Sequence, residues 1–235
     1  ERPAARPFRT TPMYDVFDGM GAVWGAQYGL EVVNYFALPG EPRYETPSFK
    51  RSNAWEATAR EVRAVREGVG INEVQNFGKF RVTGAGARGW LDRIMAGAIP
   101  APGRLSLTPM LAPKGRIIGD FTVTCLSETE CQITGSYGAQ DQHLRWFQMN
   151  LDEGVTVENV SDRITGFQIA GPKARELLAR VTRADVSAEA FRFMEAKRIT
   201  VGMVDCLVQR VSYTGDLGFE IFCDFMAERA LWHAL

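Results

Sequence analysis

Three strand-like segments follow one another in the middle of the chain, and only short turns separate them. They are 104–111 (RLSLTPML), 116–126 (RIIGDFTVTCL) and 130–136 (ECQITGS). Parallel neighbours need a crossover of a dozen or more residues, so turns this short join antiparallel strands. The segments therefore predict an antiparallel meander, and this run constrains the fold more than any other feature of the sequence.

Helical and strand-like patterns alternate irregularly along the rest of the chain. Apolar spacing predicts helices over 52–70, 88–97, 139–151 and 171–181, and strands over 78–84, 155–161, 164–171, 199–215 and 218–224. Irregular order with hairpins indicates an α+β fold with antiparallel or mixed sheets, built from ferredoxin-like units. The same order argues against a doubly wound parallel sheet.

The first 50 residues differ in character from the rest. Residues 1–12 look like a linker, and Thr11 with Pro12 predicts the start of a short helix. Residues 31–50 are aromatic-rich and are expected to be irregular. We therefore divide the chain into an N-terminal linker and lead segment (1–50) and a main domain (51–235). Because the sequence stops within an apparent helix, we expect it to be part of a longer protein.

Composition excludes several classes of function. The chain has 235 residues, of which 46% are hydrophobic, enough for one large domain or two small ones. Lys and Arg number 27, Asp and Glu 28, and the net charge is −1, which is not the footprint of a nucleic-acid binder or a polybasic membrane anchor. No secretory leader or membrane-spanning run is recognisable in the sequence.

The thiols and imidazoles do not suggest a metal site. The cysteines lie in or beside apolar strand-like runs and form no CxxC pair, so we expect buried free thiols: Cys125, Cys131, Cys206 and Cys223. With only two histidines, a zinc site has little to build on. A reducing compartment is expected, either the cytoplasm or, in a eukaryote, the mitochondrial matrix.

One short motif resembles a nucleotide-binding loop. GAGARG (84–89) satisfies G-x-G-x-x-G, follows a strand and opens a helix. A dinucleotide site also needs an acidic residue about 20 positions later, and that region contains none. We interpret these glycines as a tight strand-to-helix turn in preference to a NAD or FAD site.

An aspartate stands inside the second strand of the meander, where Asp is disfavoured. Alternation places Asp120 on the face opposite Phe121 and Val123, and Gly119 leaves room for a close approach. A solvated strand residue and a pocket carboxylate both fit this pattern, and spacing alone slightly favours the former.

A second candidate lies at the end of the chain. Tyr213 and Glu220 flank the glycine-containing turn of SYTGDLGFEIF (212–222), and Glu220 faces away from Phe219 and Ile221. An aromatic ring and a carboxylate on two limbs of a hairpin could hold a flat, hydrogen-bonding heterocycle. An ordinary hairpin with a surface glutamate fits equally well.

Three motifs resemble those of one enzyme family in the same order. Segment 116–126 is similar to the G-G-I-x-D-D-L-I-V strand of the aminomethyltransferase (glycine-cleavage T-protein) family. FQIAGPKARELL (167–178) resembles its A-L-Q-G-P-x-A segment, and 212–222 resembles its Y-T-G-E-x-G-x-E-I motif. Segment 13–37 resembles the stretch that follows the flavin domain in dimethylglycine and sarcosine dehydrogenases. The resemblance covers nearly the whole chain and implies the folate-binding fold of this family.

The sequence departs from the family at a few positions. The family's paired acids appear here as Gly119–Asp120, which keeps the second acid, the one usually assigned to catalysis. Leu30 and Tyr35 replace typical tryptophans of the dehydrogenase group.

The resemblance implies a tetrahydrofolate-binding domain that captures a one-carbon unit from an iminium donor as 5,10-methylenetetrahydrofolate. It implies that Asp120 is catalytic, as a stabiliser of the cation and an acceptor of the amine proton. Glu220 would bind the pterin N–H groups and Tyr213 would line the site. The implied partners are an N-methylated amine or its iminium and a FAD-dependent oxidoreductase domain upstream, with no metal, nucleic acid or membrane.

Two alternatives remain open. The first is a stand-alone aminomethyltransferase or a folate-dependent demethylase. The second is a non-catalytic folate-binding scaffold domain; the K-G-C-Y-x-G-Q-E motif of such iron–sulfur-assembly relatives is not found in these 235 residues.

Overall fold

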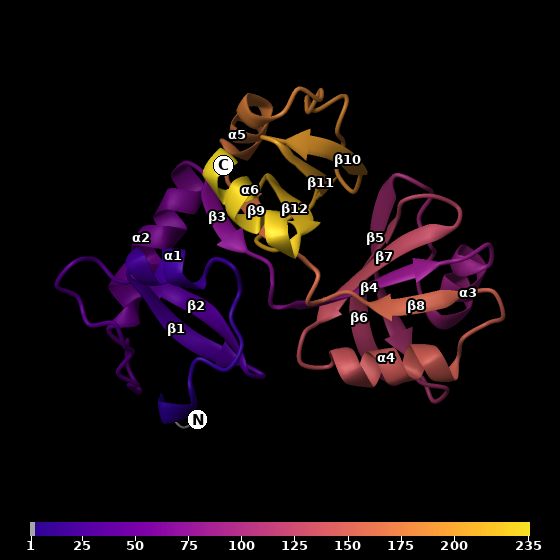
Figure 1. Ribbon diagram of the computed structural model, residues 1–235, viewed down its shortest axis with the longest axis horizontal. Helices are drawn as coiled ribbons and strands as arrows, with labels where there is room; N and C mark the ends of the chain where they lie inside the picture. The colour runs from indigo at the N-terminus through magenta and orange to yellow at the C-terminus, as the bar shows by residue number, and fades with distance from the viewer. Residues whose placement is uncertain (1–2) are drawn as a thin grey trace.

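The computed structural model describes residues 3–235, and two five-stranded sheets lie beside each other in it (Figure 1). Every strand pair within them is antiparallel. The β6 sheet has the order β5 (Arg104–Leu111), β6 (Ile117–Cys125), β7 (Glu130–Ser136), β4 (Phe77–Thr83), β8 (Thr156–Asn159). The β12 sheet has the order β10 (Ala196–Val201), β11 (Val204–Gln209), β12 (Gly218–Asp224), β9 (Ile164–Ala170), β3 (Gly70–Glu73). The predicted α+β class and the meander over 104–136 are confirmed.

Helices cover the outer face of the β6 sheet. These are α3 (Ala87–Ile94) and α4 (Gln140–Met149). Phe121 of β6 and Phe80 of β4 pack against Phe147 of α4, and Trp90 of α3 completes the cluster with edge-on ring contacts. The alternation read from the sequence is therefore confirmed, since Phe121 points to this core and its neighbour Asp120 to the opposite face.

The β12 sheet is covered in the same way on its own outer side. Its helices are α1 (Tyr14–Gly19), α5 (Ala174–Val181) and α6 (Glu228–Ala234), with the 3-10 turns Pro3–Ala5 and Phe225–Ala227 nearby in the chain. Phe167 and Phe219 are fully buried in this core, and Phe17 of α1 packs edge-on against Trp232 of α6. Glu220 alternates with Phe219 and so points to the inner side.

The two sheets consequently turn their more polar faces toward each other. A small apolar cluster fills part of the space between them: Val74, Leu105, Ala196, Leu207 and Phe222. The chain crosses between the sheets twice, through residues 74–76 and again through residues 160–163. The Gln75 amide donates to the Ser161 carbonyl at 2.7 Å, which joins the two crossings.

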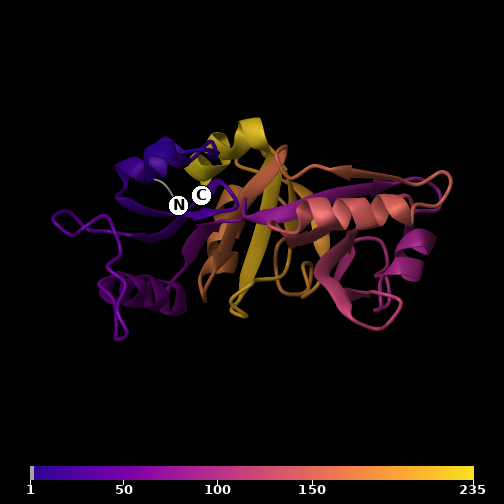
Figure 2. The ribbon, with the colours of Figure 1, turned by 90° about the horizontal axis from the view of Figure 1, so that it is seen from below.

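The N-terminal part corrects one expectation. Residues 31–50 were expected to be irregular, yet β1 (Ala22–Gln27) and β2 (Leu30–Phe36) form a hairpin that carries α2 (Ala54–Glu67). Figure 2 shows this unit, the β12 sheet and the β6 sheet in a row along the longest axis. The division of the chain at residue 50 stays a prediction.

Boundaries also differ from the sequence reading. The sequence pattern predicts one strand over 199–215, but Gly202, with φ +60°, turns the chain between β10 and β11. Helix α1 begins at Tyr14 rather than Pro12. The strand-to-helix turn predicted for GAGARG (84–89) is confirmed for 84–86, since β4 ends at Thr83 and α3 begins at Ala87. A Cβ on Gly84 would lie 2.0 Å from the Gly154 carbonyl oxygen. Within residues 3–235, no helix is long and apolar enough to cross a membrane.

Candidate functional site

A cavity of about 930 Å³ lies where the inner faces of the two sheets meet. The three residues singled out from the sequence all line it: Asp120 from the β6 sheet, and Tyr213 and Glu220 from the β12 sheet and its β11–β12 loop. The fold thus brings together side chains that lie up to 100 residues apart in the sequence. A volume of this size can accommodate a drug-sized ligand.

Glu220 supplies an unpartnered carboxylate to the cavity wall. No hydrogen bond or ion pair joins it to any of the residues that the structure describes. Burial raises the pKa of this carboxyl to about 7, and the charge of Lys79 acts in the opposite direction. A desolvated acceptor group that faces a cavity is suited to bind a ligand with N–H donors.

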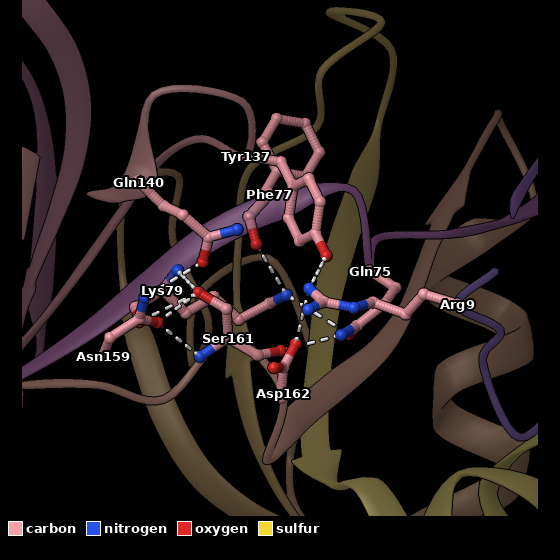
Figure 3. Close-up of polar contacts among 9 residues, drawn as sticks. All are labelled: Arg9, Gln75, Phe77, Lys79, Tyr137, Gln140, Asn159, Ser161 and Asp162. Atoms are coloured by element: carbon pink, nitrogen blue, oxygen red, sulfur yellow. Dashed lines mark hydrogen bonds and ion pairs between the residues drawn. The ribbon is translucent and has the colours of Figure 1, made fainter. Parts of the chain in front are cut away.

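Lys79 is fully buried between the sheets, on the inner face of β4 (Figure 3). Its Nζ donates to the Phe77 carbonyl at 3.1 Å and to Gln75 Oε1 at 3.4 Å. Burial lowers the pKa of this amine to about 7, against the charges of Glu228, Glu73, Asp162 and Glu220. Lys79 was not singled out from the sequence, because a lysine within FGKFRVT is equally typical of an exposed strand position.

Asp120 lies on the β5–β6 side of the cavity, where it is paired across the strands with Pro109. Its side chain is exposed, so water reaches the carboxylate in this structure. Thr122, two residues along the same face, also lines the cavity. The aspartate is therefore both water-accessible and part of the cavity wall, so it combines the two alternatives that the sequence left open.

Gly119 has a different role from the one expected of it. A Cβ at this position would lie 2.6 Å from His143 Nε2 and 2.9 Å from a ring carbon of Phe121. The space beside Gly119 is therefore filled by the protein core and not by a ligand. His143 is buried, its Nε2 lies 3.3 Å from the Ile118 carbonyl, and burial lowers its pKa.

Restoring the family's paired acids should accordingly destabilise this chain. We expect Gly119→Asp to lower the free energy of unfolding by about 2–3 kcal/mol, because the new side chain overpacks the His143 ring and buries a carboxylate. Urea denaturation followed by circular dichroism measures this. Gly89→Asp is the matched control, since a Cβ there meets no atom within 4 Å. Equal stability of the two variants would contradict the packing argument.

Tyr213 is held to the site through its backbone. Its N–H donates to Gln168 Oε1 at 2.9 Å, while the residue as a whole is 83% exposed and its ring lies 6.4 Å from the Phe77 ring, centroid to centroid. Gln168 itself lines the cavity from β9. The sequence offered one signal for it that we did not use, a glutamine inside the apolar run FQIAG.

Tyr137 is a further cavity residue that the sequence reading missed. Its hydroxyl accepts a hydrogen bond from Arg9 Nη1 at 2.6 Å, and Arg9 also lies 3.6 Å from Asp162 (Figure 3). Arg9 belongs to the segment that we read as a linker. This contact ties residues 3–12 to the β7–α4 turn and orients the phenol ring at the cavity.

Two buried acids form a separate group near the β3 end of the site. Burial raises the pKa of Glu73 to about 7 and that of Glu228 to about 8, and the two carboxyls interact with each other. The Thr165 hydroxyl donates to Glu228. Neither acid lines the cavity, so we regard this pair as part of the packing of α6 on β9.

The cysteines behave as expected. All four are buried and free, and Cys125 and Cys131 are neighbours across β6 and β7. Among the described residues no cluster of His, Cys, Asp and Glu could hold a metal ion. A smaller cavity of about 290 Å³, lined by Arg81, Glu130 and Arg198 among others, contains none of the three predicted residues.

The geometry combines three chemical functions around one cavity. An unpartnered carboxylate and the Gln168 amide present hydrogen-bonding groups for a flat heterocycle, aromatic rings flank it, and a second carboxylate stands on the opposite sheet. An anionic group in that position can stabilise a cationic carbon and accept a proton.

Comparisons with known proteins agree on one family. The family model described as GCVT N-terminal domain matches residues 13–235. The human protein "Dimethylglycine dehydrogenase, mitochondrial" is 32% identical over 226 residues, which are 94% of this chain and 26% of that protein. The Bacillus subtilis protein "Aminomethyltransferase" is 28% identical over 220 residues, 92% of this chain and 54% of that protein. The chain thus spans about a quarter of the first relative and half of the second.

Solved structures share the fold. The glycine cleavage system aminomethyltransferase T from Bartonella henselae superposes with a TM-score of 0.78 at 19% identity, over 97% of this chain and 56% of that chain. A chain of the heterotetrameric sarcosine oxidase from Corynebacterium sp. U-96 gives a TM-score of 0.58 at 19% identity, over 80% and 93% of the two chains. The resemblance drawn from the three sequence motifs is confirmed.

Proposed function

Because this chain belongs to the GCVT N-terminal domain family, we propose that it binds tetrahydrofolate and transfers a one-carbon unit to it. The product is 5,10-methylenetetrahydrofolate, and the donor is the iminium of an N-methylated amine. We further propose that the domain works within a FAD-dependent dimethylglycine or sarcosine dehydrogenase. The similarity to the human dimethylglycine dehydrogenase and to a sarcosine oxidase chain supports this context.

One observation carries the proposal: Glu220 and Asp120 line a single cavity from opposite sheets, and Glu220 has no partner among residues 3–235. A carboxylate that is desolvated and unpaired costs free energy unless a ligand satisfies it. The pterin ring, with its adjacent amino and N–H donors, fits this acceptor. The residues present therefore suit tetrahydrofolate.

The roles follow from the positions of the side chains. Glu220 holds the heterocycle, and Tyr213 closes over it from the β11–β12 loop. Tetrahydrofolate supplies the two nucleophilic amines that take up the one-carbon unit: the first adds to the iminium carbon, the carbon–nitrogen bond to the donor then breaks, and the demethylated amine leaves as the second amine closes the methylene bridge. Asp120 stabilises the cationic donor and then removes the proton that the attacking amine must lose. Because Asp120 is exposed on the wall of the cavity, the iminium that donates the one-carbon unit has room to bind beside its carboxylate.

A second function uses the same site with a different donor. The Bacillus subtilis relative named aminomethyltransferase matches 92% of this chain. In that case the one-carbon unit would come from an aminomethyl group on a carrier rather than from an N-methylated amine. A folate-dependent demethylase and a non-catalytic scaffold are further alternatives, and the compartment, cytoplasm or mitochondrial matrix, stays a prediction.

Calorimetric titration with tetrahydrofolate tests the proposal at its first step. We expect saturable binding by the purified protein, followed by formation of methylenetetrahydrofolate when dimethylglycine or sarcosine is oxidised by the complete enzyme. Binding without turnover would favour the scaffold, and turnover only with an aminomethylated carrier would favour the stand-alone transferase. If tetrahydrofolate does not bind at all, the proposal fails.

Lys79 should tune the protonation of Glu220. We expect Lys79→Met to move the pH midpoint of tetrahydrofolate binding upward by about one unit, because an opposite charge nearby favours the ionised carboxylate and the variant removes it. Titrations between pH 5.5 and 8.5 locate the midpoint. Lys173→Met, at an exposed lysine before α5, is the control and should leave it unchanged. An unmoved midpoint in Lys79→Met would show that Lys79 acts only in packing.

A further inference from the structure

Three polar side chains form one row across the inner face of the β12 sheet. Glu220 of β12 is paired directly with Gln168 of β9, and Gln168 is paired directly with Asn72 of β3. All three line the large cavity. Directly opposed residues have their Cβ atoms about 4.5–5.5 Å apart, a spacing comparable to the hydrogen-bonding edge of a single six-membered ring.

The orientation of the Gln168 amide is fixed by chemistry. Its Oε1 accepts the Tyr213 backbone N–H at 2.9 Å, and a backbone N–H can only donate. The Nε2 amino group therefore points away from this contact. It has no hydrogen-bond partner among residues 3–235, although the side chain as a whole is only 5% exposed.

The row thus presents a defined sequence of acceptors and donors. The Glu220 carboxylate offers two acceptor oxygens, and the Gln168 amide beside it offers the two donors of its Nε2 group, because its oxygen is turned toward the Tyr213 N–H. The complementary ligand edge has two adjacent donors followed by an acceptor. A 2-amino-4-oxo ring has this order, namely the 2-amino group, the ring N3–H and the 4-oxo oxygen. A 2,4-diamino ring presents an amino group, an unprotonated ring nitrogen and a second amino group.

Building on the proposed function, we propose that Gln168 is the specificity-determining residue that reads the 4-oxo group of the pterin while Glu220 binds its two donors. The 4-oxo oxygen satisfies the free Gln168 amide, whereas a 4-amino group places a donor against a donor. Gln168 on β9 then adds to the selectivity for 4-oxo over 4-amino pteridines that Glu220 already has, since its carboxylate meets an N3–H donor in the 4-oxo ring and an unprotonated nitrogen in the 4-amino ring. This contribution does not require any change in the catalytic carboxylate.

Folic acid and aminopterin test this, because their rings differ only in the group at position 4 and in the proton that the 4-oxo ring carries on N3; the part of the preference that depends on Gln168 is the part that its variants change. Titrations at pH 8 keep Glu220 largely ionised. We expect the wild-type protein to bind folic acid about 10- to 100-fold more tightly than aminopterin, the range for a buried polar group left unpaired. Gln168→Glu retains an acceptor for the Tyr213 N–H but loses the donors. The ratio of the aminopterin to the folic acid dissociation constant should therefore fall at least tenfold.

The controls separate this inference from the proposed function. Gln148→Glu adds the same charge at an exposed position of α4 and should preserve the wild-type ratio. Gln168→Leu removes the amide without adding charge, and its ratio should also fall, which covers a failure of Gln168→Glu to fold. If tetrahydrofolate and folic acid bind but the ratio is the same in wild type and both Gln168 variants, the role of Gln168 is overturned while folate binding stands. If no folate binds to the wild type, both fail.

Discussion

Glu220→Gln is expected to weaken tetrahydrofolate binding about 100-fold. The substitution keeps the shape of the side chain but replaces one acceptor oxygen with an amino group, which then opposes a ligand donor. Loss of a charge-assisted hydrogen bond costs about 1.5–3 kcal/mol, and the new amino group that faces a ligand N–H adds to this cost. Isothermal titration calorimetry at pH 8 measures the dissociation constant of each protein.

The pH dependence of binding gives an independent reading of the same residue. Burial raises the pKa of Glu220 from 4.5 to about 7, so the carboxyl is protonated in the free protein below that pH. Ligand donors favour the ionised form, and affinity should therefore fall about tenfold for each pH unit below 7 and level off above 8. Lys79 loses its charge over the same pH range and so favours the ionised Glu220 less as the pH rises. The affinity therefore approaches its upper limit more gradually.

Glu220→Gln should abolish this slope, since an amide does not titrate in this range. Glu189→Gln, at an exposed position outside the cavity, is the matched control and should retain both the affinity and the slope. A Glu220→Gln variant that binds tetrahydrofolate as tightly as the wild type would remove Glu220 from the site.

Asp120→Asn is expected to lower the rate of one-carbon transfer by about 10²–10⁴-fold with little change in tetrahydrofolate affinity. An amide neither accepts the proton of the attacking amine nor stabilises a cationic donor, and loss of a positioned general base has this magnitude. The measurement is single-turnover formation of methylenetetrahydrofolate by the complete enzyme, with tetrahydrofolate saturating. The separation of rate from binding distinguishes a catalytic role from a role in affinity.

Asp92→Asn provides the comparison for this experiment, because Asp92 is exposed on α3 at the outer side of the β6 sheet. It should leave both rate and affinity intact. Unchanged turnover in Asp120→Asn would mean that another group takes the proton. A large loss of affinity with an unchanged rate at saturation would instead place Asp120 among the binding residues.

Side-chain alternation predicted the directions of the key residues because each strand has one strongly apolar face. Phe121 and Val123 specify the outer face of β6, and Phe219 and Ile221 that of β12, so Asp120 and Glu220 had to point inward. Their convergence on one cavity did not follow from alternation. It depends on how two sheets pack, and only the resemblance to a known family suggested it.

Other features left no local signal. The β1–β2 hairpin forms a two-stranded sheet of its own, with Arg9 bridged to Leu30 beside it, and its glycines and aromatic residues obscured the alternation. Gln168 is a single polar residue inside the apolar run FQIAG, a pattern that does not distinguish a cavity residue from one buried in the core. The Lys79 amine bonds to Gln75 and Phe77 nearby in the chain, but Ser161, Glu220 and Glu228 come close to it only after the chain has crossed between the sheets twice, which no short window of sequence can reveal.

The row of Glu220, Gln168 and Asn72 makes ligand recognition a property of strand alignment. A slip of β9 by a single residue against β12 would turn Gln168 into the outer core and bring Phe167 or Ile169 to the cavity in its place. No residue would have changed, yet the pattern of donors and acceptors would be erased. The buried phenylalanines that fix the pairing of these strands therefore determine the chemistry of the site as directly as the polar side chains that line it.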